Sequence, residues 1–352
     1  MRWKIVVTVR CILWVLLPVS PLCLNELRSN ELGGGIESDY TSNDYCEGDC
    51  GLVCQCVPQT CFSAKTNFIW LSRGKVDPND LILTPADAPA TPLLQTSQLE
   101  FDIAGGVELG LQTKRTNGRV WELRYFGIYD QQANERRTYI DGDAITTNDA
   151  AVSHFGSFLG SNTDLTTNYA SDLNNLEANV WMNPFWGFEP VVGVRFVRHA
   201  EELQTTVTND LTEGAFVDFD NNLFGAQLGL RRVLWERYEG WGCGYRVEAT
   251  VKGCAFHNSM QLDSELRTGG ATIPTFDRTF SSIAYGGELG VTAVLQFCPY
   301  FSMNIGYTGL WLDRVGLASD QLDDFNAVAG TGNVDLTTLI YHGGHVGFEF
   351  AW

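Results

Sequence analysis

Five cysteines lie close together near the N-terminus, at positions that could bind a metal or form disulfides. They are Cys46, Cys50, Cys54, Cys56 and Cys61, spaced C-x3-C-x3-C-x-C-x4-C. Structural zinc sites use pairs of cysteines two residues apart, often with histidines, and this segment has neither. Disulfides in an oxidising compartment explain the cluster better than a metal does. The spacing leaves their connectivity open.

The other residues that could do chemistry are scattered along the chain. Three histidines and an aspartate have no partner at a spacing typical of catalysis: His154, His199, His257 and Asp210. Two acidic clusters lack the full spacing of a calcium-binding loop: Asp141 with Asp143, and Asp320 with Asp323 and Asp324. We therefore predict no catalytic residue, no metal and no cofactor, and a protein that is not an enzyme.

The first 24 residues are typical of an export signal. Arg2, Lys4 and Arg10 supply positive charge, and the apolar stretch 11–17 follows them. That stretch is shorter than the roughly 20 residues of a membrane-spanning helix, and a short N-terminal anchor is the alternative. We expect the polar, Cys-rich segment 25–63 to be irregular and to lie outside the main fold.

Composition excludes several classes of protein. The 352 residues include 23 basic and 42 acidic ones, so the net charge of −19 leaves no basic face for nucleic acid. A hydrophobic content of 44% with only 18% charged residues argues against disorder. The 36 glycines and the 20 Phe, 12 Tyr and 10 Trp residues favour many β-strands. A mean hydropathy of −0.08 is compatible with a membrane β-barrel, because its strands alternate.

From residue 64 onward, apolar and polar residues alternate with the period of half-exposed strands. In the last stretch Val346, Phe348 and Phe350 alternate with Gly347 and Glu349. We count ten such strands in residues 64–352. The weakest is 64–73, where Phe68 and Trp70 compete with Ile69 and Leu71 for the outward face.

The predicted connections alternate in length. Four short ones lie around 117–118, 183–184, 237–240 and 298–299, and five long ones at about 74–96, 131–170, 205–220, 259–279 and 316–338. Short periplasmic turns alternating with long extracellular loops are typical of an up-and-down transmembrane β-barrel. This parity places both chain ends in the periplasm.

Aromatic residues support a lipid-facing outer wall. Seven of them fall at the short-turn end of the strands: Trp121, Phe185, Trp186, Trp241, Phe297, Tyr300 and Trp352. Tyr129 and Trp311 fall toward the other end. Two aromatic belts match the two headgroup layers of a membrane.

The chain closes on a pattern that carries a resemblance. His345, Gly347, Phe350 and Trp352 are spaced like the terminal β-signal of bacterial outer-membrane β-barrel proteins, which the chain resembles over 64–352. The blocks NVWMNPFWGFEPVVGVRFV and HVGFEFAW, after a Cys-rich segment, resemble the β-barrel porins of planctomycetes. The resemblance implies the outer membrane of a didermic bacterium, contact with its lipid and barrel-assembly machinery, and a pore. It transfers no site residues.

Charged residues on the inward face would line the lumen. The predicted acids are Glu100, Asp102, Glu108, Glu122, Glu177, Glu189, Glu248, Glu288 and Glu349, and the predicted bases are Arg124, Arg195, Arg231, Arg246 and Lys252. This excess of acid would favour cations in an open pore. The alternative is that the charges pair across a filled lumen, because a barrel of about ten strands is narrow.

Three cysteines lie far downstream of the cluster. If the strands on either side of residue 270 pair, Cys243 and Cys298 meet at the short-turn end, and we predict a disulfide between them. Cys254 would then be free.

Together these features predict an outer-membrane porin for passive diffusion of small solutes, with cations favoured. The alternative is a closed structural or adhesive barrel whose long extracellular loops bind partners. A rim protease built on the scattered histidines is a third and weaker hypothesis. The solute and the oligomeric state, including a homo-oligomer, stay open.

Overall fold

The computed structural model describes one part of the chain. The described residues are 61–74, 81–85, 94–95, 98–138, 145–146, 164–207, 210–239, 243–268, 271–321, 325–326, 331–332 and 334–352. All of them belong to the second of two compact units, residues 54–352. The predicted signal 1–24, and Cys46 to Cys56 of the Cys-rich segment, lie outside the described residues. So do His154, Asp141 and Trp241.

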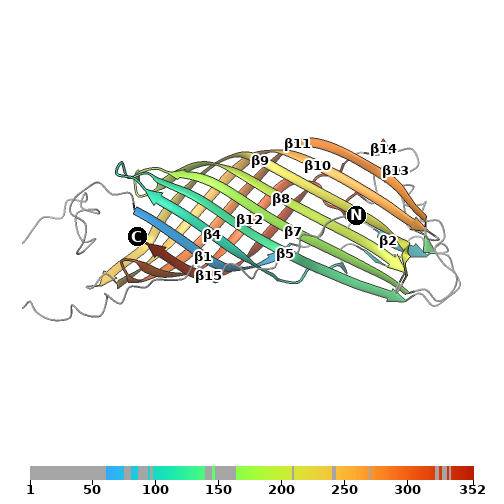
Figure 1. The fold of residues 1–352 in the computed structure, drawn as a ribbon, viewed down its shortest axis with the longest axis horizontal. Coiled ribbons are helices and arrows are strands. Elements are labelled where there is room, and N and C mark those ends of the chain that lie inside the picture. The colour runs from blue at the N-terminus through green and yellow to red at the C-terminus, as the bar shows by residue number, and fades with distance from the viewer. Residues whose placement is uncertain are drawn as a thin grey trace, which may run out of the picture. The chain divides into compact units, whose positions relative to one another are not determined.

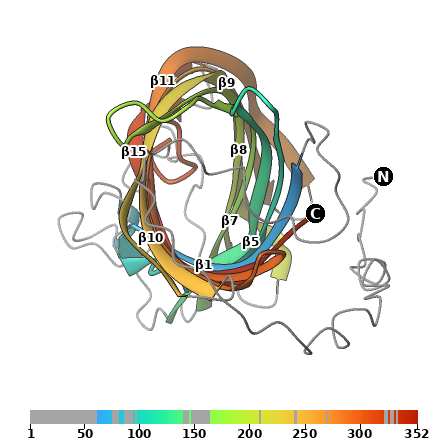
Figure 2. The same ribbon diagram turned by 90° about the vertical axis from the view of Figure 1, so that its left-hand side faces the viewer.

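Ten antiparallel strands form one closed barrel (Figures 1 and 2). They are β1 (Cys61–Arg73), β4 (Ala104–Lys114), β5 (Val120–Thr138), β7 (Asp164–Trp181), β8 (Glu189–Val207), β9 (Asp210–Glu239), β10 (Cys243–Thr268), β11 (Ala271–Cys298), β12 (Phe301–Val315) and β15 (Thr337–Ala351). Five short strands lie outside the ring: β2 (Leu81–Pro85), β3 (Leu94–Gln95), β6 (Ile145–Thr146), β13 (Phe325–Asn326) and β14 (Thr331–Gly332). The predicted all-β, ten-stranded fold is confirmed.

The first strand of the barrel closes it by pairing on both sides. Phe68 of β1 lies opposite Val346 of β15 on one side and Val107 of β4 on the other. The structure also shows which residues of this strand face outward, because Phe68 is 57% exposed on the outer wall while Ile69 is buried in the lumen. The strand begins at Cys61, three residues before the predicted start.

Two of the five predicted long loops are strands. Residues 205–220 and 259–279 lie mostly within strands, because only 208–209 separate β8 from β9 and only 269–270 separate β10 from β11. Two of the four predicted short connections, 117–118 and 183–184, fall between the end of one strand and the start of the next. The other two, 237–240 and 298–299, lie partly within strands, because β9 continues to Glu239 and β11 to Cys298. Loop length therefore alternates less strictly than the sequence suggested.

The outward-facing side chains change from apolar to charged about halfway along the strands, at the cross-strand pair Phe196–Phe224. We call the part between this level and the short turns the lower barrel, and the part beyond it the upper barrel. Outward residues of β8 in the lower barrel are apolar, as at Val192 and Val194, whereas Arg198 and Glu202 are outward in the upper barrel. Residues 188–196 match the length of about 9–11 residues with which a β-strand crosses a membrane.

In the upper barrel the apolar residues point inward. They form the core of the structure together with Tyr169 and Tyr341, and include Leu203, Val217, Phe219, Leu223, Phe256, Met260, Leu262 and Leu312. The apolar residues thus change face along a single strand, from Leu228 outside to Phe219 inside on β9. This change of face breaks the alternating pattern, which is why the sequence indicated loops there. Among the described residues, no helix is long and apolar enough to cross a membrane.

Candidate functional site in the barrel lumen

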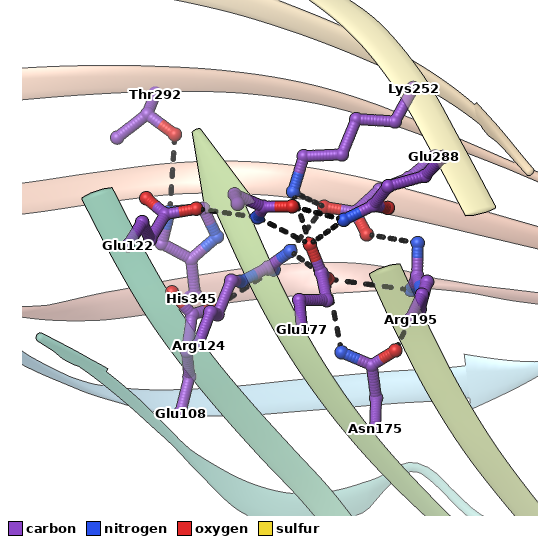
Figure 3. A network of polar contacts seen from close by, with 12 residues as sticks. Glu108, Glu122, Arg124, Asn175, Glu177, Arg195, Lys252, Glu288, Thr292 and His345 are labelled. Carbon is purple, nitrogen blue, oxygen red and sulfur yellow. Dashed lines mark hydrogen bonds and ion pairs between the residues drawn. The ribbon is translucent and has the colours of Figure 1, made fainter. Parts of the chain in front are cut away.

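Glu177 of β7 lies at the centre of a network of buried charges in the lumen (Figure 3). Its Oε1 accepts hydrogen bonds from Arg124 (3.0 Å) and from Asn175 (3.0 Å). Its Oε2 accepts from Lys252 (2.7 Å), and three contacts to other side chains complete the shell: Asn179 at 3.1 Å, Gln227 at 3.0 Å and Arg195 at 3.8 Å. A buried carboxylate is stable only with partners of this kind.

Arg124 carries the network across the barrel. Its guanidinium, on β5, pairs with Glu108 (3.1 Å), with Glu177 (3.0 Å) and with Glu288 (2.5 Å). Glu288 is on β11, five strands away from β5 in the ring of ten and therefore on the opposite wall. Arg195 pairs with the other oxygen of Glu288 at 3.0 Å. Ion pairs thus join opposite walls of the lumen at this level, and we call them the central network.

A second buried ion pair lies in the upper barrel. Arg73, at the end of β1, pairs with Glu201 of β8 at 2.5 Å, and both side chains are fully buried. The guanidinium also lies over the rings of Phe101 (4.3 Å) and Tyr169 (5.2 Å), and Tyr169 donates to Glu201 at 2.5 Å. Phe101 belongs to the segment before β4, and its ring packs against Arg73 and Tyr169 inside the barrel.

Residues 316–321, which follow β12, cross the lumen in the upper barrel and are named the plug segment. Asn221 of β9 donates to the Gly316 carbonyl at 2.7 Å and accepts from its amide at 3.0 Å. The Ala318 amide donates to Glu201 at 2.7 Å. Leu317 and Ala318 are buried. Since β9 and β8 are three and four places from β12 in the ring, the plug segment reaches the far wall.

Ser171, His199 and Glu201 lie together in the upper barrel, in an arrangement that superficially resembles a catalytic triad. Ser171 lies 3.1 Å from Nε2 of His199, but Glu201 approaches the same nitrogen at 3.5 Å, and Nδ1 has no partner. A relay needs the acid on the opposite nitrogen from the nucleophile. The group is also fully buried. His257 is exposed on the outer wall, and Asp320 lies in the plug segment. No cluster of potential metal ligands occurs in the described ranges.

Below the central network, the lower barrel holds a polar cavity of about 180 Å³, which we call the vestibule. Residues from both the network and the short-turn end line it, among them Arg124, Lys252, Trp181 and Glu349. The central network forms its roof, since Glu108, Arg124, Lys252 and Glu288 are among the lining residues.

Twelve of the fourteen predicted pore-lining residues are on the inner wall, and most of them are paired. They are Glu108, Glu122, Arg124, Glu177, Glu189, Arg195, Arg231, Arg246, Glu248, Lys252, Glu288 and Glu349. Glu100 and Asp102 are not on the inner wall, because β4 begins only at Ala104 and both side chains are exposed.

The sequence analysis missed three charged residues of the lumen: Lys65, Arg73 and Glu201. The first two belong to the strand whose faces were ambiguous, and Glu201 lies where the apolar residues have changed face. With these corrections, eight acidic and seven basic residues are named on the inner wall. The predicted excess of acid, and with it the argument for cations, largely disappears.

The predicted disulfide is absent from the structure, since Cys243 and Cys298 are both free thiols. Gly244 pairs with Gln296, so the next position, Cys243, lies beside residue 297, and its thiol contacts the Phe297 carbonyl at 3.0 Å. Cys298 is one residue further on, after an irregularity in the register. Cys254 is a free, buried thiol, and Cys61 is free and exposed.

The four residues of the predicted β-signal divide between the two faces of β15. His345 and Gly347 are buried in the lumen, whereas Phe350 and Trp352 are exposed on the outer wall. A Cβ at Gly347 would lie 2.0 Å from the Thr66 carbonyl, so a larger residue could not fit there without moving β1.

Comparisons with known proteins give only distant likenesses. No family model and no curated protein matches the chain. Among solved structures, the outer membrane protease OmpT of Escherichia coli is 9% identical, with a TM-score of 0.45 over 85% of this chain and 99% of that one. The toluene transporter TodX of Pseudomonas putida is 8% identical, with a TM-score of 0.32 over 82% of this chain and 88% of that one. At these levels neither likeness assigns an activity, and neither links the chain to planctomycete porins.

Proposed function

We propose that this chain is an outer-membrane β-barrel whose lumen is closed by the central network and the plug segment. It is then a structural or adhesive barrel rather than an open porin or an enzyme. Its lower barrel contacts lipid, and its terminal segment is the one that the barrel-assembly machinery would bind. The observation that carries the closed lumen is Arg124, which pairs with carboxylates on opposite walls.

The outer wall of the lower barrel supports a membrane location. Large apolar side chains are exposed there across neighbouring strands, namely Phe68, Leu111, Phe224, Leu228, Leu289 and Ile305. Charged residues occupy the inside. A continuous apolar band of this kind is rare on a soluble monomer and typical of a membrane barrel. Aromatic residues, among them Trp121, Trp186 and Trp352, are exposed at the short-turn end, and Tyr129 and Trp311 toward the other end.

A charged substitution tests the membrane location. Leu228, in the middle of the apolar stretch of β9, is 67% exposed. In a membrane, Leu228→Arg is expected to lower the free energy of unfolding from phospholipid vesicles by about 2–4 kcal/mol. The control is Asn134→Arg on the exposed outer wall of the upper barrel, with an expected change within about 0.5 kcal/mol. Equal, small effects of both variants would show that the band does not face lipid.

Planar-bilayer recording tests the closed lumen. Wild-type protein inserted into the bilayer is expected to show no open-channel steps, because the central network and the plug segment each obstruct the lumen. Regular steps carried by potassium chloride would overturn the closed-barrel proposal in favour of the porin. Insertion is verified independently, by protection of the barrel from added protease.

A further inference from the structure

A group of exposed cations lies beside the short turns, in a chain whose net charge is −19. Most cations with described side chains pair with carboxylates, as Lys65 and Arg198 do. Four exposed ones, which we call the basic rim, have no carboxylate partner among the described residues: Lys114, Arg115, Arg119 and Arg232. Glu122, the acid closest to the β4–β5 turn on β5, accepts hydrogen bonds from Gln112 and Asn179 in the lumen instead. The basic rim therefore keeps its full charge for an anion from outside the chain.

Contacts between neighbouring turns bring the basic rim together. A Cβ at Gly118, in the turn between β4 and β5, would collide with the side chain of Asn183, so this turn touches the one between β7 and β8. Phe188 ends that second turn, and the guanidinium of Arg232 on β9 lies over its ring, 4.9 Å from the centroid. The cations of two adjacent turns and of β9 thus lie along one side of the short-turn end.

Aromatic side chains place the basic rim at the edge of the membrane. Trp121 is 47% exposed and Trp186 is 85% exposed, and the guanidinium of Arg115 lies 5.5 Å from the ring centroid of Trp121. Exposed Trp and long basic side chains lie in the headgroup layer of a membrane. Phe188 and Arg232 are at the lower limit of the apolar stretch of β8 and β9. The cations of the rim therefore face the phosphates of the leaflet on the short-turn side.

An apolar groove in the outer wall begins next to the basic rim. Its volume is about 440 Å³, within the range of about 300–1,000 Å³ that is usual for ligand sites, and its lining includes Pro190, Val192, Leu230 and Gly253. Leu230 is two residues from Arg232 on β9, so the two side chains are neighbours on the same face. A Cβ at Gly253 would meet nothing within 4 Å, so the missing side chain of this residue leaves the groove open.

We propose that the basic rim and the groove form one binding site for an anionic phospholipid, with the headgroup at the rim and an acyl chain in the groove. A soluble anion would leave the groove empty, and a lipid without net charge would leave the cations uncompensated. The site rests on the proposed membrane location, to which it adds a class of lipid.

Native mass spectrometry of the full chain, folded in dodecyl maltoside, tests the site by counting bound lipid. Dioleoylphosphatidylglycerol is expected to stay bound at one molecule per chain. Dioleoylphosphatidylcholine, which has the same acyl chains and no net charge, is expected to bind more weakly. Each cation contributes about fivefold to the affinity for an anionic lipid surface, so Arg119→Gln with Arg232→Gln is expected to weaken phosphatidylglycerol binding by about 25-fold. Binding of phosphatidylcholine should not change.

Matched controls are available for both parts of the site. Arg314, near the far end of β12, is another exposed cation without a carboxylate partner in the described part of the chain, and Arg314→Gln should leave lipid binding unchanged. Gly253→Leu fills the groove and is expected to weaken binding of both lipids. Gly309→Leu makes the same change on β12, where an added Cβ also meets nothing within 4 Å, and should bind lipid like the wild type.

Three outcomes would overturn the site. Equal binding of the two lipids would show that the rim does not select a headgroup, but would leave the membrane location standing, because that location requires lipid of no particular class. Displacement of phosphatidylglycerol by sodium phosphate would show that the rim binds a free anion. Dimers of the chain without bound lipid would assign the groove to a second copy. A failure of the membrane location itself would appear separately, as equal effects of Leu228→Arg and Asn134→Arg.

Discussion

Glu177→Gln is expected to lower the free energy of unfolding by about 3–5 kcal/mol, the largest effect of a single isosteric change in this barrel. Glu177 is fully buried and pairs with Arg124 and Lys252, with Arg195 close by. Removing its charge leaves three buried cations with Glu288 as the one carboxylate that contacts all of them. The new amide nitrogen would also face donors such as the Lys252 ammonium, and two donors cannot bond to each other.

The measurement is urea-induced unfolding of the detergent-folded protein, followed by tryptophan fluorescence. The matched control is Glu189→Gln, the same substitution at another inner-wall carboxylate. Glu189 pairs with Arg231 at 2.5 Å, but both side chains are more than one-fifth exposed. A partly hydrated pair contributes little, so the control is expected to change stability by no more than about 1 kcal/mol. Equal losses in the two variants would mean that the central network is not a buried electrostatic centre.

The lower barrel could be predicted from the sequence because one physical rule governs it. Each strand there has lipid-type side chains outside and charged ones inside, so a period of two predicts both the strand and the direction of its side chains. Glu177, Arg195 and Lys252 were placed on the inner wall for this reason. The rule also predicted correctly which residues of β7 and β8 face inward over their lower halves.

The upper barrel could not be predicted in the same way, because the rule reverses there. Phe219 points inward and Asp220 outward, as in a barrel surrounded by water, while Leu228 on the same strand points outward. The reversal places apolar residues out of phase with those of the lower barrel. A search for one continuous alternation ends at the reversal and indicates a loop. Glu201 was missed for the same reason.

Ion pairing across the lumen also cannot be predicted from a single sequence. The alternation shows that Arg124 and Glu288 face inward, but not that their strands are opposite one another in the ring. Only the closed order of strands brings together these two residues, which are 164 positions apart in the sequence. An acid excess counted along the chain therefore predicted an open, cation-favouring lumen, whereas the three-dimensional arrangement is a nearly balanced set of ion pairs.

The central network and the plug segment are expected to act as two barriers in series. Opening the lumen then requires that both be removed. Arg124→Ala takes away the cation that joins opposite walls. Gly316→Val displaces the plug segment, because a Cβ at this position would lie 2.3 Å from the ring of Phe219, which is itself buried. In planar bilayers we expect no open-channel steps from either single variant and regular steps from the double variant.

Two matched controls separate this effect from general loosening of the barrel. Gly309→Val is the same substitution on β12, the strand that leads into the plug segment, at a position where an added Cβ would meet nothing within 4 Å. Arg231→Ala removes a guanidinium that borders the vestibule and pairs with Glu189 at the short-turn end. Neither control, alone or combined with the other, should conduct, and far-UV circular dichroism should report unchanged strand content in every variant.

The pattern of conductance among the variants identifies which barrier closes the barrel. Steps from Arg124→Ala alone would show that the plug segment does not obstruct the lumen, despite the hydrogen bonds that tie Gly316 to Asn221. Steps from Gly316→Val alone would show the same of the central network. A folded double variant that stays silent would contradict the arrangement of only two barriers, and would point to the buried Arg73–Glu201 pair, which joins β1 to β8 and is left intact, as a further obstruction.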